Sequence, residues 1–271
     1  MKAERQRGNL LDGRTWTCYS VSIWSDIRKS KEELELKHPA LFPIELPQRV
    51  IECFLRPEGR MVLDPFCGLG STVLAAHGLG RVGVGLDINQ RYVEAARGRL
   101  GQCQDGCRIV CADASDVLDH VDPESVDLVV TSPPYWNVLS RPRSADRKPI
   151  RNYGDESGDL GRLSVYDEFL AALRAVFERL REAMRPGAYC VVVVMDLRKG
   201  REFHPLHADL ASAMKESGYI WDDTIIWDRR HEYNNFRPLG YPSVFRVNKA
   251  HEYVLIFQKP GRGRATCERS G

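Results

Sequence analysis

"RMVLDPFCGLGST", residues 60–72, is the stretch of sequence that decides the fold. Its first half, Arg60–Asp64, predicts a short strand, and its second half places Gly68 and Gly70 before a helix expected to begin at Ser71. Glycines let the backbone turn tightly and approach a ligand, and the free amides that open a helix favour a negative group. On its own a Gly-x-Gly fragment also fits an ordinary tight turn. The residues around the fragment therefore have to decide between a ligand-binding turn and an ordinary tight turn.

The pattern of strand followed by helix continues along the chain. Strands are expected at residues 60–64, 82–87, 108–111, 126–131, 189–195, 219–227 and 253–257. Helices are expected from residue 71 and over residues 90–100, 165–184 and 206–217, with Pro186-Gly187 ending the third of them. Alternation of this kind implies right-handed crossovers and a mostly parallel sheet covered on both faces. We predict one α/β domain.

Composition excludes several classes of protein. The chain has 271 residues and no apolar run near the roughly 20 residues that a membrane span requires. Residues 1–7 contain no apolar signal core, so we expect a cytoplasmic protein. Eight cysteines in a chain of this length do not suggest a disulfide framework, and Cys103, Cys107 and Cys111 form no C-x-x-C pair, so no metal site is expected. A net charge of +2 does not by itself indicate nucleic-acid binding.

Three acidic residues follow three consecutive predicted strands. Asp64 and Asp87 end the first two strands, and Asp113 follows the third. A carboxylate about twenty residues after the glycine turn can bind a ribose diol, and Asp113 can reach an adenine amino group, although each Asp alone also suits a helix cap. Val73 stands where a dinucleotide motif has its third glycine, and an acid before the turn disfavours a pyrophosphate. The pattern favours S-adenosylmethionine over NAD.

A second motif, "VDLVVTSPPYWN", covers residues 126–137. A buried strand runs directly into Ser132, Pro133, Pro134 and Tyr135. Two consecutive prolines donate no backbone hydrogen bonds and fix φ near −65°, so the strand must end there in a stiff bend. The bend offers a hydroxyl, free carbonyls and an aromatic ring at the edge of the sheet, which indicates that it positions another molecule.

These motifs resemble those of the amino-group DNA methyltransferases. Residues 64–72 resemble the cofactor motif of that family, and residues 130–135 are similar to the catalytic motif of its N4-cytosine members. Residues 38–43 look like the segment that closes over the methionine end of the cofactor, and residues 225–257 resemble the terminal strands. The resemblance implies a Rossmann-like fold with a mostly parallel seven-stranded sheet and S-adenosylmethionine as cofactor. The expected cofactor-binding residues are His38, Pro39, Phe42, Asp64, Pro65, Phe66, Gly68, Gly70, Ser71, Thr72, Asp87 and Asp113.

The resemblance also implies a reaction. Ser132 Oγ and the Pro133 carbonyl would accept the two N–H groups of an exocyclic amine, Pro134 would stiffen the bend, and Tyr135 would stack on a flipped-out base. The motif contains no cysteine, which argues against C5-cytosine methylation. N4 of cytosine is the preferred target, because N6-adenine members more often begin the motif with Asp or Asn. N6 of adenine is the alternative, and RNA or a protein amide are less favoured substrates.

Two polar segments are the candidate DNA contacts. Residues 137–163 and 228–249 interrupt the alternation, and both mix basic and aromatic side chains. The expected DNA-binding residues are Trp136, Arg141, Arg143, Arg229, Arg230 and Arg237, with Trp136 equally suited to packing under the loop. Double-stranded DNA is the expected partner, and a companion restriction endonuclease acting on the same site is a second candidate.

The expected domain organisation is simple. Residues 1–37 are an N-terminal extension, 38–260 the methyltransferase domain and 261–271 a flexible tail. The aromatic segment 16–24 has no assigned role. A DNA-binding relic without activity is the non-enzymatic alternative, and the intact Asp64, Gly68 and Ser132 argue against it.

Overall fold

The structure is a computed structural model that describes residues 8–36, 41–102, 106–137, 158–232, 243 and 246–262. The described residues form an eight-stranded sheet in the order β1-β9-β10-β6-β5-β2-β3-β4, and a separate two-stranded hairpin, β7-β8. The strands are β1 (Ile23–Trp24), β2 (Met61–Asp64), β3 (Val82–Asp87), β4 (Arg108–Cys111), β5 (Val126–Thr131), β6 (Met184–Val194), β7 (Leu197–Lys199), β8 (Glu202–His204), β9 (Ile220–Asp228) and β10 (His251–Gln258).

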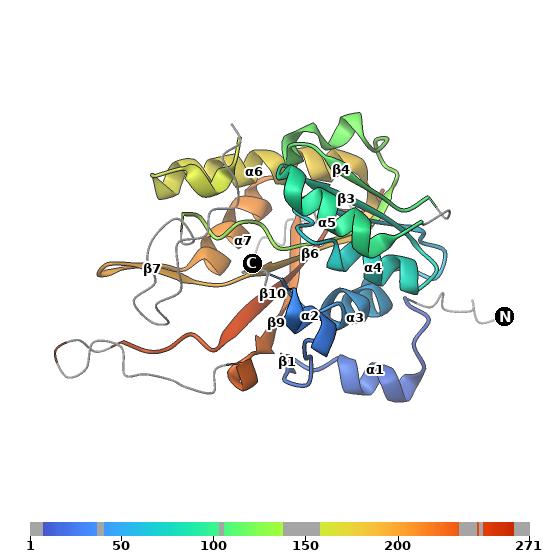
Figure 1. Cartoon of the computed structure of the whole chain (residues 1–271), viewed down its shortest axis with the longest axis horizontal. Helices are drawn as coiled ribbons and strands as arrows, with labels where there is room; N and C mark the ends of the chain where they lie inside the picture. The colour runs from blue at the N-terminus through green and yellow to red at the C-terminus, as the bar shows by residue number, and fades with distance from the viewer. Residues whose placement is uncertain are drawn as a thin grey trace, which may run out of the picture.

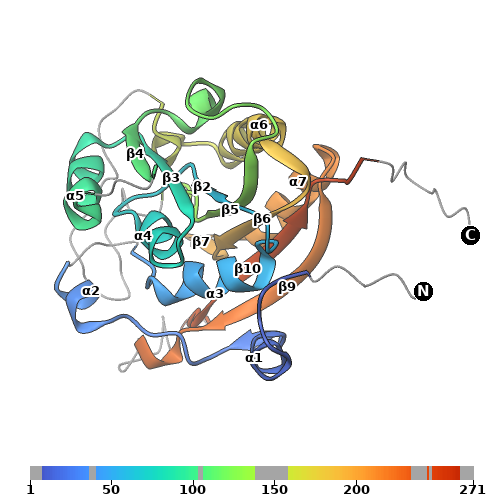
Figure 2. The same ribbon diagram turned by 90° about the vertical axis from the view of Figure 1, so that its right-hand side faces the viewer.

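The helices cover both faces of the large sheet (Figure 1). They are α1 (Gly13–Tyr19), α2 (Lys31–Glu35), α3 (Glu45–Phe54), α4 (Ser71–Gly78), α5 (Gln90–Leu100), α6 (Tyr166–Ala183) and α7 (Leu206–Glu216), with short 3₁₀ helices η1 (Ala114–Asp119), η2 (Leu160–Arg162) and η3 (Arg230–Glu232). Figure 2 shows α6 and α7 on one side of the sheet and α3 and α4 on the other. Each face buries its own apolar core, one around Phe169 and Phe177 of α6 and one around Trp24 and Trp227.

The sheet confirms the predicted α/β class. Strands β2 to β6 pair in parallel, and β10 pairs antiparallel with both β6 and β9. The order of the strands reverses between β2 and β5, because β3 and β4 extend to one side of β2 while β5 and β6 extend to the other. In open α/β sheets, ligands bind at the carboxyl ends of the strands at such a reversal. The predicted cofactor motif follows β2 and the predicted catalytic motif follows β5.

Two expectations about the sheet are corrected. Residues 23–24 belong to the sheet as β1, which runs parallel to β9, so the described sheet has eight strands in place of the expected seven and includes part of the expected N-terminal extension. Trp24 is buried in the core beside Trp227, which accounts for part of the aromatic segment 16–24. The helix expected over residues 165–184 ends at Ala183, close to its expected end, but the strand expected from residue 189 already begins at Met184 as β6. The register of β6 against β5 shifts near its start, so the strand accommodates Pro186 and Gly187.

No helix in the described ranges combines the length and the apolar character that crossing a membrane would require. The expected cytoplasmic location stays a prediction.

Candidate active site

The glycine turn, residues 65–70, connects β2 to α4. Gly68 and Gly70 have φ angles of 50° and 77°, in the left-handed region that favours glycine. A Cβ atom at Gly70 would lie 3.2 Å from the Cβ of Ala96 on α5, so the turn also requires glycine for close packing. Asp87 at the end of β3 accepts a hydrogen bond from the Gly68 amide at 2.8 Å. The first two of the predicted acids therefore flank one turn.

Asp64 joins the glycine turn to the catalytic motif. Its Oδ1 accepts hydrogen bonds from the Thr131 hydroxyl at 2.6 Å and the Phe66 amide at 3.1 Å, and its Oδ2 accepts one from the Thr72 hydroxyl at 2.7 Å. Thr131 is the last residue of β5 and directly precedes Ser132. Asp64 is buried, and this burial raises the pKa of its carboxyl to about 6 despite the hydrogen bonds, which act in the opposite direction. The two predicted halves of the site thus share one carboxylate.

The segment before α3 lies against the start of α4. The Ser71 hydroxyl donates to the Phe42 carbonyl at 3.0 Å, and the Phe42 ring packs against the core that contains Trp24. This contact places residue 42 beside the glycine turn. His38 and Pro39, expected in the same role, lie outside the described residues.

Asp113 follows β4 and caps the 3₁₀ helix η1. Its Oδ1 accepts from both the amide and the hydroxyl of Ser115, each at 2.8 Å. Its Oδ2 faces Gly158, where a Cβ atom would lie only 2.5 Å from that oxygen. The capping role considered for a single Asp is therefore present, and its predicted adenine contact stays a prediction.

Residues 132–135, the proline corner, follow β5 at the same edge of the sheet. The Ser132 Oγ lies 3.1 Å from the Tyr135 hydroxyl. That hydroxyl lies 2.8 Å from Oε2 of Glu252, to which it donates a hydrogen bond. Glu252 is a buried residue near the start of β10. Sequence reasoning missed it, although an acid inside the apolar run "HEYVLIF" was a signal that could have found it.

Two of the expected DNA-binding residues are corrected. Trp136 is only 3% exposed, and its Nε1 donates to the Leu163 carbonyl at 2.7 Å, so of its two suggested roles it has the packing one. Arg229 forms ion pairs with Glu252 and Glu232, and its side chain is 16% exposed, so its guanidinium is already bound inside the protein. Both residues lack the exposed surface that a DNA contact needs.

Of the four other expected DNA-binding residues, the structure describes only Arg230. Arg230 is 75% exposed, although its guanidinium binds the Asp228 carboxylate at 2.6 Å. Arg141, Arg143 and Arg237 lie outside the described residues.

An unexpected basic and aromatic surface is formed by the hairpin β7-β8 together with Lys249, which precedes β10. Phe203 is 40% exposed, the Arg198 guanidinium carbon lies 5.4 Å from its ring centroid, and Lys249 Nζ lies 4.7 Å from the same point. We call these three residues the hairpin surface. The hairpin begins three residues after the end of β6 and extends away from the body of the sheet (Figure 1). The hairpin contacts Trp136, the residue after the proline corner. The His204 ring centroid lies 5.1 Å from the Trp136 ring centroid, and Lys199 Nζ lies 3.8 Å from it.

Comparison with known proteins gives the family. The family model described as DNA methylase, which groups N6 and N4 methyltransferases, matches residues 4–98 and 126–266. The chain belongs to this family. A general methyltransferase-domain model also matches residues 63–147, which include the glycine turn and the proline corner.

Individual relatives match shorter stretches. The type II methyltransferase M.ScaI of Streptomyces caespitosus is 44% identical over 78 residues, 29% of this chain and 25% of that protein. A tRNA (guanine(10)-N2)-dimethyltransferase of Methanothermobacter thermautotrophicus is 32% identical over 127 residues, 45% of this chain and 37% of that protein. The putative DNA modification methylase TTHA0409 of Thermus thermophilus, solved with S-adenosyl-L-methionine, is 30% identical, with 58% of this chain and 57% of that chain covered and a TM-score of 0.40. The chain thus spans less than two thirds of the length of these relatives.

S-adenosylmethionine is the cofactor of this chain, in keeping with its family. The described residues fit this group, because three carboxyl groups lie at or just after the ends of adjacent strands and a glycine turn lies between them. Asp87 would bind the ribose hydroxyls, since a carboxylate has about four lone-pair sites and the amides of Gly68 and Asn89 each use one. The negative charge of Asp64 suits a positively charged amino acid and sulfonium far better than a pyrophosphate.

Proposed function

We propose that the protein transfers a methyl group to an exocyclic amino group of a base in DNA, with N4 of cytosine as the preferred target. The observation that carries the proposal is the Asp64 carboxylate. It binds the glycine turn through Phe66, the start of α4 through Thr72, and the last residue of β5, next to the proline corner, through Thr131. A methyl donor held at the turn and an amine held at the corner would be neighbours. Membership of the DNA methylase family supports the same reaction.

The proline corner suits a poorly nucleophilic amine. The lone pair of an exocyclic amino group is delocalised into the ring of the base. Hydrogen bonds from its two N–H groups to Ser132 Oγ and the Pro133 carbonyl would favour a pyramidal nitrogen whose lone pair is directed away from these acceptors. S-adenosylmethionine supplies a methyl group made electrophilic by a positive sulfur. Pro133 and Pro134 keep the acceptors rigid, so catalysis consists mainly of positioning and electrostatics.

Two further features concern the base itself. The Tyr135 ring is half-buried beside Ser132 and would stack on the base, which must leave the duplex to reach the corner. Serine as the first residue of the motif favours N4 of cytosine in this family, and N6 of adenine is the second target within the same reaction. The chemistry of the corner is the same for both amines.

The hairpin surface supports a nucleic-acid substrate. Cations next to an exposed aromatic ring suit contact with phosphates and stacking on bases. We include the hairpin surface, Arg230 and the segment 137–163 in the proposed DNA contact, and leave Trp136 and Arg229 out of it. Several relatives carry the name type II methyltransferase, which supports a companion restriction endonuclease acting on the same site. The tRNA-modifying relative supports RNA as a second class of substrate.

The test identifies the methylated nucleoside. The full chain is incubated with methyl-labelled S-adenosylmethionine and either duplex DNA or tRNA, and each nucleic acid is digested to nucleosides and separated. We expect label in N4-methylcytosine from DNA, and we expect Ser132→Ala to form it more than about tenfold more slowly. Label in N6-methyladenine would change the target base within the proposed reaction. Label in RNA alone would overturn the DNA assignment.

A further inference from the structure

We propose that Glu252 is a positioning residue for methyl transfer: acting through Tyr135, it fixes the direction of the Ser132 hydroxyl so that the Ser132 oxygen faces the substrate amine only as an acceptor. The inference rests on the proposed function, because it concerns the same amine. It adds to that function a buried residue on β10, which is more than a hundred residues from the motif in sequence.

The hydrogen-bond directions follow from counting protons. An ionised carboxylate has no proton to give, so the Tyr135 hydroxyl is the donor to Glu252 Oε2 at 2.8 Å. The Val193 carbonyl lies farther from that hydroxyl, at 3.5 Å. A tyrosine has one hydroxyl proton, so at the 3.1 Å contact with Ser132 the Tyr135 oxygen can only accept. The one proton of the Ser132 hydroxyl is then committed to Tyr135.

The charge of Glu252 is fixed by its surroundings. Its Oε1 is bound by the guanidinium of Arg229, which also binds Glu232. Lys29 Nζ lies 3.9 Å from Glu232, so the network contains two cations and two carboxylates. Glu252 is 5% exposed, and a carboxylate so buried requires a cationic partner of this kind to stay ionised. Arg229 therefore serves this network.

Tyr135 keeps its proton in this environment. Burial raises the pKa of its phenol well above the ordinary value, and the negative charge of Glu252 raises it further. The phenol thus stays a neutral group that can pass the direction of one hydrogen bond to the next.

The direction of the Ser132 hydroxyl proton matters for the reaction. A free serine hydroxyl can also point its proton at the amine nitrogen and engage the lone pair that must attack the methyl group. The chain from Ser132 through Tyr135 to Glu252 excludes that orientation. Both lone pairs of the Ser132 oxygen then remain for the N–H group of the substrate.

The decisive variant is Glu252→Gln, with Glu232→Gln as its matched control. A glutamine at 252 keeps the shape but can donate through its amide, which lets the two hydroxyls reverse. Glu232→Gln removes the other carboxylate bound by Arg229 without touching Tyr135. We expect Glu252→Gln to lower the single-turnover methylation rate about tenfold or more. We expect the cofactor Kd of both variants, and the rate of Glu232→Gln, to stay within about twofold of the wild type.

Two further measurements separate positioning from simple structural support. In a double-mutant cycle with Tyr135→Phe, the combined variant should be no slower than Tyr135→Phe alone, because both changes interrupt one chain. In protein with ¹³C-labelled tyrosine, Glu252→Gln should lower the pKa of Tyr135 by removing a nearby negative charge, and this readout needs no substrate. If the wild type methylates no nucleic acid, the proposed function is overturned. If Glu252→Gln still lowers the pKa of Tyr135 in that case, the Glu252–Tyr135 contact is supported. An unchanged rate, additive losses or an unchanged Tyr135 pKa would overturn the positioning role.

Discussion

Ser132 and Asp64 have different roles in the site, although they are close: Asp64 binds the hydroxyl of Thr131, the residue that directly precedes Ser132. Ser132 offers its oxygen to the substrate amine in the proposed reaction. Asp64 uses both of its oxygens inside the protein, on the hydroxyls of Thr72 and Thr131 and on the Phe66 amide. A substitution at Ser132 should therefore affect catalysis, whereas one at Asp64 should affect the assembly of the site and its stability.

Ser132→Ala removes the hydroxyl acceptor and leaves both prolines in place. We expect the single-turnover rate to fall by more than about tenfold, because an acceptor that acts on the reacting group is lost. Cofactor affinity, measured by isothermal titration calorimetry, should not change, because the described cofactor-binding residues belong to other segments. Equal losses of rate and cofactor affinity would contradict the role given to Ser132.

Asp64→Asn tests the raised pKa of the Asp64 carboxyl directly. The pKa of Asp64 is about 6 in the folded protein and its ordinary value is 3.8, so the folded state binds this proton more tightly than the unfolded state. Wild-type stability should therefore fall as pH rises from about 4 to about 6, by about 3 kcal/mol from this residue. Asparagine does not titrate, so the variant should lack this fall. Urea denaturation without cofactor at pH 4.5 and 7.5 measures it, and parallel pH profiles would refute the shift.

At the scale of elements, the boundaries of helices and strands were predicted correctly where single residues begin or end an element by their own chemistry. The bounds predicted for residues 82–87, 90–100 and 126–131 agree with β3, α5 and β5. Asp87, the Asn89 cap and the proline pair mark these boundaries locally, so no long-range contact is needed to find them. The glycine turn and the proline corner were found for the same reason.

Other elements depend on distant partners and were missed. The hairpin β7-β8 has the sequence "LRKGREFH", which lacks the alternation of a half-buried strand. Strand β1 has only two residues and exists because β9 pairs with it. The contact of Glu252 with Tyr135 depends on the place of β10 between β6 and β9, and the chain order alone did not reveal that place.

The hairpin surface gives a prediction about binding. Replacing Arg198 and Lys249 together by alanine should weaken DNA affinity and reduce the slope of log K against log salt by about 0.9 for each lost phosphate contact. Lys215→Ala is the matched control, because this exposed lysine lies in the last turn of α7. Fluorescence anisotropy over a salt series measures both variants. A slope equal to that of the control would remove the hairpin from the proposed interface.

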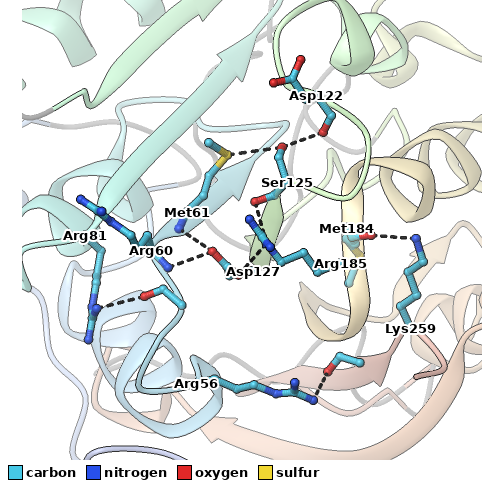
Figure 3. Close-up of polar contacts among 12 residues, drawn as sticks. Arg56, Arg60, Met61, Arg81, Asp122, Ser125, Asp127, Met184, Arg185 and Lys259 are labelled. Carbon is cyan, nitrogen blue, oxygen red and sulfur yellow. Dashed lines mark hydrogen bonds and ion pairs between the residues drawn. The ribbon is translucent and has the colours of Figure 1, made fainter. Parts of the chain in front are cut away.

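At the scale of the whole molecule, the sheet has two edges with different roles: the carboxyl edge, where the parallel strands end, and the opposite edge, where they begin. The carboxyl edge holds the glycine turn and the proline corner. At the opposite edge, Asp127 Oδ2 accepts from the amides of Arg60 and Met61 at 2.8 and 3.0 Å, and Arg185 Nε lies 3.0 Å from Oδ1 (Figure 3). This carboxylate connects the starts of β2, β5 and β6 far from the chemistry.

Asp127→Ala should separate stability from activity. It leaves two backbone amides without their acceptor, so we expect the free energy of unfolding to fall by about 1–3 kcal/mol. The single-turnover rate per folded molecule should match the wild type, because the carboxyl edge is untouched. Urea denaturation and active-site titration provide the two values. A changed cofactor Kd would show that the two edges are not independent.

The carboxylate shared by the turn and the corner has a consequence for the order in which ligands bind. Movement of the glycine turn during loading would be transmitted through Asp64 and Thr131 to the residue that meets the target base. We expect the two ligands to bind cooperatively. Thermodynamic reciprocity then requires nucleic acid to tighten S-adenosylmethionine by the same factor by which S-adenosylmethionine tightens nucleic acid.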